Sequence, residues 1–303
     1  MHHHSHSHEP SNGANGFNLA FALAVGLNLA FTLIEAIYAT LANSMSLLAD
    51  AGHNLGDVLG LTLAWGAALL VNRRATRRYS YGLKRTTILA AITNALILVA
   101  TSAIIAYESI YKLLYPANLN EMIVIIVALI GILINGSTAL LFMRGHKEDL
   151  NIKGAFLHLA YDALISFGVV IGGIIILLTG WVRLDPIIGL MIVVTILLGT
   201  WGLLRDSVNL LLDAVPDNIE LDKVAKYLSD IEGVSEVHDL HIWGLSTNEI
   251  ALTAHLIMPE MELNDNHYKN INHDLKEHFR ITHVTLQIER GNSEEPCEFA
   301  KTC

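Results

Sequence analysis

The chain has 303 residues, 52% of them hydrophobic, and a mean hydropathy of +0.45. This composition excludes an ordinary soluble globular protein and favours a chain that crosses a lipid bilayer several times. The net charge of −10 is uneven, because the chain from Asp213 onward holds 18 Asp or Glu against 7 Lys or Arg. Such an acidic segment repels nucleic acid, so we expect no nucleic-acid partner.

The first 16 residues are polar and show no signal peptide. Their histidines are interrupted by Ser5 and Ser7, whereas an affinity tag is usually an unbroken run. We interpret residues 1–16 as a native metal-capturing tail, with a partial tag as the open alternative. Its histidines are His2, His3, His4, His6 and His8.

Six apolar segments follow, each long enough to cross a bilayer as a helix of roughly 20 residues. They predict an all-α six-helix membrane bundle within residues 17–208. Basic residues gather in the second and fourth connections, so the positive-inside rule places both termini in the cytoplasm. The predicted helices span about 17–41, 47–71, 86–114, 120–143, 152–179 and 185–204.

Charged side chains near the start of the second apolar segment are unusual, because a charge deep in lipid is costly unless it is paired or bound to metal. His53 and Asp57 are four residues apart, so on a helix they share one face. Asp50 lies on the same face. We predict that Asp50 accepts the other N–H of the His53 ring and orients it, the alternative being a role at the helix N-terminus.

The same pattern recurs at His158 and Asp162 in the fifth segment. At about 1.5 Å rise per residue, antiparallel second and fifth helices bring His53 level with Asp162 and Asp57 level with His158. Two imidazoles and two carboxylates suit tetrahedral Zn²⁺. Imidazole must lose its proton to bind metal. The sequence therefore predicts a membrane carrier that exchanges a divalent transition metal for protons.

The last part of the chain, residues 209–291, reads as a small cytoplasmic metal-binding domain of α+β class. Its expected order is α-β-β-α-β, with the elements at 219–231, 236–244, 250–258, 264–278 and 283–290.

Several histidines of this domain fall on predicted strands, and Glu289 closes the last strand. We expect His241 and His255 to be neighbours across the hairpin, with a metal site or plain surface positions as the two open interpretations. The other strand histidines are His238 and His283. A flexible C-terminal tail, 292–303, holds both cysteines, Cys297 and Cys303, as further candidate ligands.

Four motifs in order resemble the cation diffusion facilitator family, closest to its zinc-transporter branch. They are the run from Ser46 to Asp57, the Tyr81-Gly82 turn with 88–91, His158-x-x-x-Asp162, and the run from His238 to Trp243. The resemblance covers about 17–290. It implies a homodimer with a ferredoxin-like cytoplasmic domain, which exports Zn²⁺ by proton exchange and is not an enzyme.

The resemblance also assigns roles to residues. The short 145–150 connection favours a bacterial inner-membrane protein, because eukaryotic relatives often carry a long histidine-rich loop there. Rival interpretations are a broader exporter of cadmium, cobalt or iron(II), a membrane metal sensor that moves no metal, and an intramembrane metalloprotease. The last of these is disfavoured because the chain has no His-Glu-x-x-His motif. The implied transport ligands are His53, Asp57, His158 and Asp162, the implied cytoplasmic ligands His241, His255, Glu289 and His283, and the implied interdomain salt bridge Arg85 with Asp213.

Overall fold

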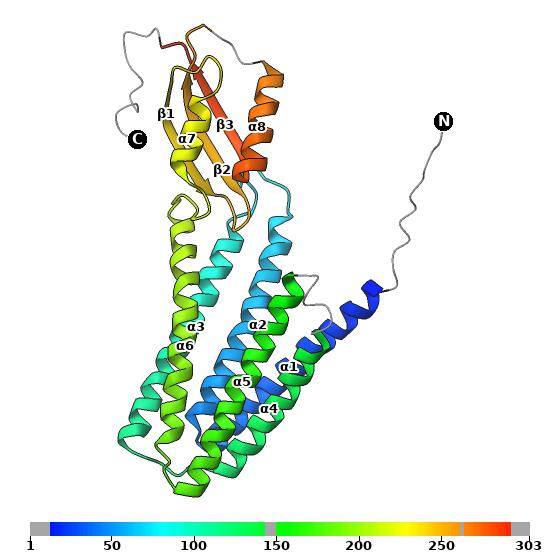
Figure 1. Ribbon diagram of the computed structural model, residues 1–303, viewed down its shortest axis with the longest axis vertical. Coiled ribbons are helices and arrows are strands. Elements are labelled where there is room, and N and C mark those ends of the chain that lie inside the picture. The colour runs from blue at the N-terminus through cyan, green and yellow to red at the C-terminus, as the bar shows by residue number, and fades with distance from the viewer. Residues whose placement is uncertain (1–12, 143–149, 261–263, 292–303) are drawn as a thin grey trace. The chain divides into compact units, whose positions relative to one another are not determined.

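The structure, a computed structural model, describes residues 13–142, 150–260 and 264–291 (Figure 1). The histidines of residues 2–8, the 143–149 connection and both cysteines lie outside these ranges. Six long helices come first, as predicted. They are α1 (Gly13–Ala42), α2 (Met45–Val71), α3 (Thr86–Leu114), α4 (Glu121–Phe142), α5 (Leu150–Thr179) and α6 (Leu184–Leu211).

Helices α2 to α6 each carry an apolar stretch long enough to span a membrane, and α1 contributes a shorter one, Gly26–Ala42. The chain is therefore a multi-pass membrane protein. The sixth helix was predicted to end near residue 204 but continues to Leu211. It stops where Asp213 adopts a left-handed conformation (φ 59°), a common helix terminator, shortly before Pro216.

Small residues on α2 decide which face meets α3. A Cβ added at Gly56 would lie 2.2 Å from Leu98 Cδ2, and one at Gly52 would lie 3.0 Å from Ile105 Cδ1. Glycine at both positions allows this close approach of the two helices, and a larger residue there would require the Leu98 and Ile105 side chains to shift. His53 and Asp57 sit beside these glycines in the sequence, so the α3 contact turns them toward a different neighbour.

The first turn of α2 is capped by a side chain from far along the chain. The carboxylate of Asp185, at the start of α6, accepts hydrogen bonds from the backbone N–H groups of Met45 (2.6 Å) and Ser46 (3.3 Å). It also accepts from the hydroxyls of Ser44 and Ser46, each at 2.6 Å. Asp185 is 2% exposed. An anion at a helix N-terminus is stabilising, so this contact ties the beginnings of α2 and α6 together.

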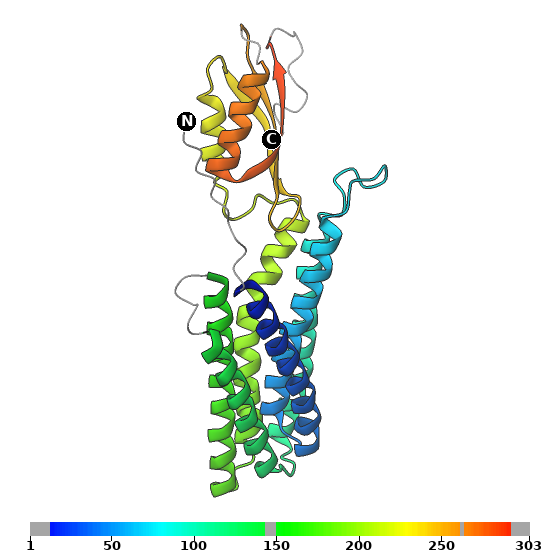
Figure 2. The ribbon, with the colours of Figure 1, turned by 90° about the vertical axis from the view of Figure 1, so that its right-hand side faces the viewer.

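The C-terminal domain has the predicted α-β-β-α-β order. Strands β1 and β2 are antiparallel, and β2 and β3 are parallel, in the sheet order β1-β2-β3. Both helices lie on one side of the sheet (Figure 2), and a shared apolar core that includes Leu252, Leu256 and Leu275 joins them to it. The elements are α7 (Leu221–Ser229), β1 (Glu236–Gly244), β2 (Ile250–Ile257), α8 (Asp265–Phe279) and β3 (Ile281–Glu289).

Candidate metal centres

The predicted transport ligands of α2 and α5 come together. His53 Nε2 lies 3.6 Å from Asp57 Oδ2 and 3.7 Å from Asp162 Oδ1. His158 Nε2 lies 3.4 Å from Asp57 Oδ2 and 3.5 Å from Asp162 Oδ2. Each helix therefore supplies one imidazole and one carboxylate, and each imidazole faces both carboxylates.

These separations fit a small tetrahedral cation. With Zn–N and Zn–O bonds of about 2.0–2.1 Å, neighbouring ligand atoms of a tetrahedron lie about 3.3–3.4 Å apart. The four imidazole–carboxylate distances, 3.4 to 3.7 Å, are close to that value, with Asp162 facing His53 through Oδ1 and His158 through Oδ2. One ligand atom each from His53, His158 and Asp162 lies within 4.8 Å of the others, and Asp57 stands outside this group of three. Both oxygens of the fully buried Asp162 and Oδ2 of Asp57 lack a hydrogen-bond partner among the described residues. Buried anionic oxygens without donors favour a cation as their partner.

Asp50 does not accept the hydrogen bond from the His53 ring that the sequence had predicted. Its Oδ2 accepts a hydrogen bond from Ser166 Oγ at 2.9 Å, and Nδ1 of His53 has no hydrogen-bond partner among the described residues. The prediction that Asp50 orients the His53 ring is therefore wrong. Asp50 lies on the predicted face of α2, but its carboxylate points toward α5. There it meets Ser166, which is one helical turn beyond Asp162.

A second cluster lies on the sheet of the C-terminal domain. His238, His255 and Glu289 can each offer one ligand atom, and these three atoms lie within 4.8 Å of one another. His255 Nδ1 is 3.0 Å from Glu289 Oε1, and His238 Nε2 is 3.5 Å from Glu289 Oε2. His238 is 7% exposed, and neither of its ring nitrogens has a hydrogen-bond partner among the described residues.

Two of the histidines expected in this cluster lie elsewhere. The strand register pairs His255 with His238, and His241 with Thr253. The expectation that His241 neighbours His255 is therefore wrong. A β-bulge causes the shift, because Asp239 takes a left-handed conformation (φ 50°) between the two histidines. His241 Nε2 lies 2.9 Å from Asp239 Oδ1, and His255 Nε2 lies 3.5 Å from Asp239 Oδ2, so the two histidines face one carboxylate without being paired across the hairpin.

His283 is also separate from the cluster. It pairs with Ala251 in the parallel register, whereas His255 pairs with Gln287. Four strand residues separate the two positions by about 13 Å. The His283 ring packs edge-on against Tyr81 at a centroid distance of 5.4 Å.

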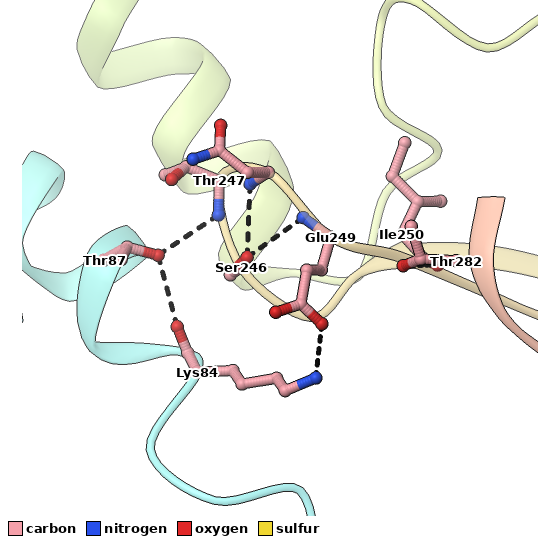
Figure 3. A network of polar contacts seen from close by, with 8 residues as sticks. Lys84, Thr87, Ser246, Thr247, Glu249, Ile250 and Thr282 are labelled. Atoms are coloured by element: carbon pink, nitrogen blue, oxygen red, sulfur yellow. Dashed lines mark hydrogen bonds and ion pairs between the residues drawn. The ribbon is translucent and has the colours of Figure 1, made fainter. Parts of the chain in front are cut away.

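The Arg85–Asp213 salt bridge is present, and a neighbouring contact joins the same parts of the chain. Lys84 pairs with Glu249 of the β1–β2 turn, and the backbone N–H of Thr247 donates to Thr87 Oγ1 at 3.1 Å (Figure 3). Sequence reasoning missed this contact. The available signal was the position of Lys84 beside Arg85 in a chain whose C-terminal domain is acidic. Only the fold shows that Glu249, in the β1–β2 turn, is the partner of Lys84.

Two family models cover nearly the whole described chain. The cation efflux transmembrane domain matches residues 21–212, and the cytoplasmic domain of cation efflux proteins matches residues 216–291. The chain belongs to the cation efflux family. Members of this family are transporters and not enzymes, and this cation efflux protein carries both matched parts.

Curated relatives align over almost their full length. The metal cation efflux system protein CzcD of Cupriavidus metallidurans is 37% identical over 98% of this chain and 92% of its own. The cadmium, cobalt and zinc/H(+)-K(+) antiporter of Bacillus subtilis is 32% identical over 94% and 91%. The zinc transporter ZitB of Escherichia coli is 34% identical over 97% and 93%. This cation efflux protein is thus similar throughout to proteins named for metal transport.

Proposed function

We propose that this protein exports Zn²⁺ from the cytoplasm in exchange for protons, with His53, Asp57, His158 and Asp162 as the ligands of the transported ion. The observation that carries the proposal is the pairing of each imidazole with both carboxylates at 3.4 to 3.7 Å. Charged groups that meet inside a membrane helix bundle mark ion pathways.

The ligand set supports zinc over harder ions. Two nitrogens and two carboxylates suit Zn²⁺, which accepts tetrahedral geometry readily, and the ZitB relative is named a zinc transporter. A second candidate is a broader exporter that also takes cadmium and cobalt, which the name of the B. subtilis relative favours. A membrane sensor would bind metal without moving it, so flux into vesicles separates it from both exporters.

The remaining assignments belong to the same proposal. The protein works as a homodimer in a bacterial inner membrane, with both termini cytoplasmic. The match to the cytoplasmic domain of cation efflux proteins supports the dimer and the cytoplasmic location of the C-terminal domain. His238, His255 and Glu289 hold a regulatory or structural zinc ion in that domain, where the three ligand atoms converge. Arg85 and Asp213 couple that domain to the helices.

Proton exchange can be tested with the protein in proteoliposomes. Ligand histidines release protons when metal binds, so protons supplied on the receiving side should drive zinc out of the opposite compartment. We expect zinc flux to fall severalfold when an ionophore collapses the pH gradient while the zinc gradient is kept constant. Fluorescent zinc and pH indicators in the lumen measure both ions. A zinc flux that ignores the pH gradient would contradict exchange and indicate facilitated diffusion.

The cytoplasmic ligands can be tested by a matched pair of substitutions in the full-length protein. His238→Ala should lower the number of zinc ions bound per chain by about one, because it removes a buried ligand of the His238–His255–Glu289 cluster. His241→Ala, three residues away, should leave that number unchanged, since His241 is not one of the three residues whose ligand atoms converge. Equilibrium dialysis with metal analysis gives the count. Equal loss in both variants would contradict the assignment.

A further inference from the structure

The connection between α2 and α3 carries more positive charge than its contacts with the C-terminal domain use (cyan in Figure 2). This connection, residues 72–85, holds six cations and no acid. Two of the cations form ion pairs with that domain, Lys84 with Glu249 and Arg85 with Asp213. The other four are arginines, so we call residues 72–85 the arginine loop. The four are Arg73, Arg74, Arg77 and Arg78.

The arginine loop is closed by its own hydrogen bonds. The backbone N–H of Thr76 donates to the carbonyl oxygen of Tyr79 at 3.0 Å, and the backbone N–H of Tyr79 donates to Thr76 Oγ1 at 3.1 Å. The two arginines between them therefore form the tip of a tight turn. Gly82 adopts a left-handed conformation (φ 75°), and a Cβ added there would lie 3.3 Å from the carbonyl oxygen of Arg73. The end of the loop thus packs on its beginning, and one compact loop presents all four arginines.

The acidic C-terminal domain does not neutralise these four arginines. All four are exposed, and no ion pair between described residues involves them, whereas Asp213 and Glu249 bind the other two cations of the loop. The contact found for Arg78 is with an aromatic ring, since its guanidinium carbon lies 5.9 Å from the centroid of Tyr79. The arginine side chains are therefore available to an anionic partner from outside the described chain.

Exposed apolar side chains of α2 indicate the depth of the loop in a bilayer. Trp65 is 66% exposed and Leu69 is 54% exposed, so both require contact with lipid. Arg73 follows Leu69 by four residues, which is about 6 Å at the rise of a helix. Tyr79 and Tyr81, 50% and 48% exposed, are of the type that gathers where acyl chains meet headgroups. These positions place the arginine loop at the level of the lipid phosphates.

We propose that the arginine loop binds the phosphate of an anionic phospholipid headgroup at the membrane surface. Clusters of about four to eight Arg or Lys directly beside a membrane helix attract anionic lipids. A guanidinium presents paired N–H donors that match a phosphate, whereas lysine offers only a point charge. Orientation of the chain in the membrane requires positive charge, but it requires neither a closed loop nor planar donors. The inference goes beyond the proposed function, because it concerns the lipid and holds whichever ion is transported.

The test uses the full-length protein in phosphatidylcholine vesicles that contain a small fraction of photoreactive lipid. The probe is either phosphatidylglycerol or phosphatidylcholine, with the same chains and the same reactive group, and mass spectrometry of the digested protein counts labels in residues 72–85. Each cation beside a membrane surface raises the affinity for anionic lipid roughly fivefold. We therefore expect phosphatidylglycerol to label this segment at least about tenfold more than phosphatidylcholine, and we expect added salt to reduce the difference.

Replacing the four arginines by glutamine should lower phosphatidylglycerol labelling of the loop to the phosphatidylcholine level. The matched control removes four exposed cations from α7 and α8 and should leave the labelling unchanged. Gel filtration shows whether both proteins are folded. The variant carries Arg73→Gln, Arg74→Gln, Arg77→Gln and Arg78→Gln, and the control carries Lys223→Gln, Lys226→Gln, Lys269→Gln and Lys276→Gln.

Three results would overturn the proposal. The first is equal labelling of the loop by the two lipids, and the second is phosphatidylglycerol labelling that persists in the folded glutamine variant. The third is loss of the label when inorganic phosphate is added at constant ionic strength, because the loop then binds a free phosphate ion and not a lipid. Should the glutamine variant not fold, the comparison of the two lipids in the parent decides alone. Zinc is absent throughout, so the outcome is independent of zinc export.

Discussion

Asp162→Asn should abolish zinc transport while the protein remains folded. Asp162 is fully buried and presents one oxygen to each imidazole of the ligand set. The amide removes the negative charge and replaces one anionic oxygen with an N–H₂ group that repels a cation. Loss of even an indirect partner of a metal site typically costs 10–100-fold in affinity, so we expect the loss of this ligand to lower flux by at least about 100-fold.

The measurement is initial zinc flux into proteoliposomes at equal amounts of reconstituted protein. Asp222→Asn, the same substitution on the surface of α7, serves as the control and should transport like the parent. Gel filtration of both variants shows whether they fold and assemble. Flux near the parent level in a folded Asp162→Asn protein would exclude the α2–α5 ligand set as the transport site.

His53→Asp should shift the metal preference from zinc toward cadmium. The ligand set becomes one nitrogen and three carboxylates, and carboxylates tolerate flexible geometries with more than four contacts. An added carboxylate can also bind through two oxygens, which admits a larger ion with more contacts. We expect some zinc transport to remain and the cadmium-to-zinc flux ratio to rise roughly tenfold, equivalent to about 1.4 kcal/mol.

The ratio is measured in proteoliposomes for mutant and parent at one pH. His273→Asp, on the exposed side of α8, is the control for the added charge and should leave the ratio unchanged. A ratio that stays level in an active His53→Asp protein would show that selectivity arises outside the ligand set.

The helical part was predictable because long apolar runs have one stable solution in a bilayer, a helix with its backbone hydrogen bonds satisfied internally. The third helix matched its predicted bounds, Thr86–Leu114, at both ends. The closeness of His53 to Asp162, and of His158 to Asp57, also followed from the predicted topology together with the rise per residue, since antiparallel helices that enter from opposite faces fix the relative depth of their residues.

Sequence reasoning failed where a local backbone change or a distant partner decided the outcome. The bulge at Asp239 breaks the two-residue strand period, so no alternation argument could choose His238 over His241 as the neighbour of His255. The direction of the Asp50 side chain depended on Ser166, 116 residues away. The Asp185 contact with the first turn of α2 spans a similar separation and has no local signature.

The way the four proposed transport ligands are divided between helices has a consequence for release. Both members of each His–Asp pair are four residues apart on one helix, so any separation of α2 from α5 divides the coordination sphere into two equal halves. Neither half is a four-coordinate site, and each keeps one imidazole and one carboxylate. The affinity for the ion would then be high only when α2 and α5 are at their closest approach, and it would fall sharply as they separate.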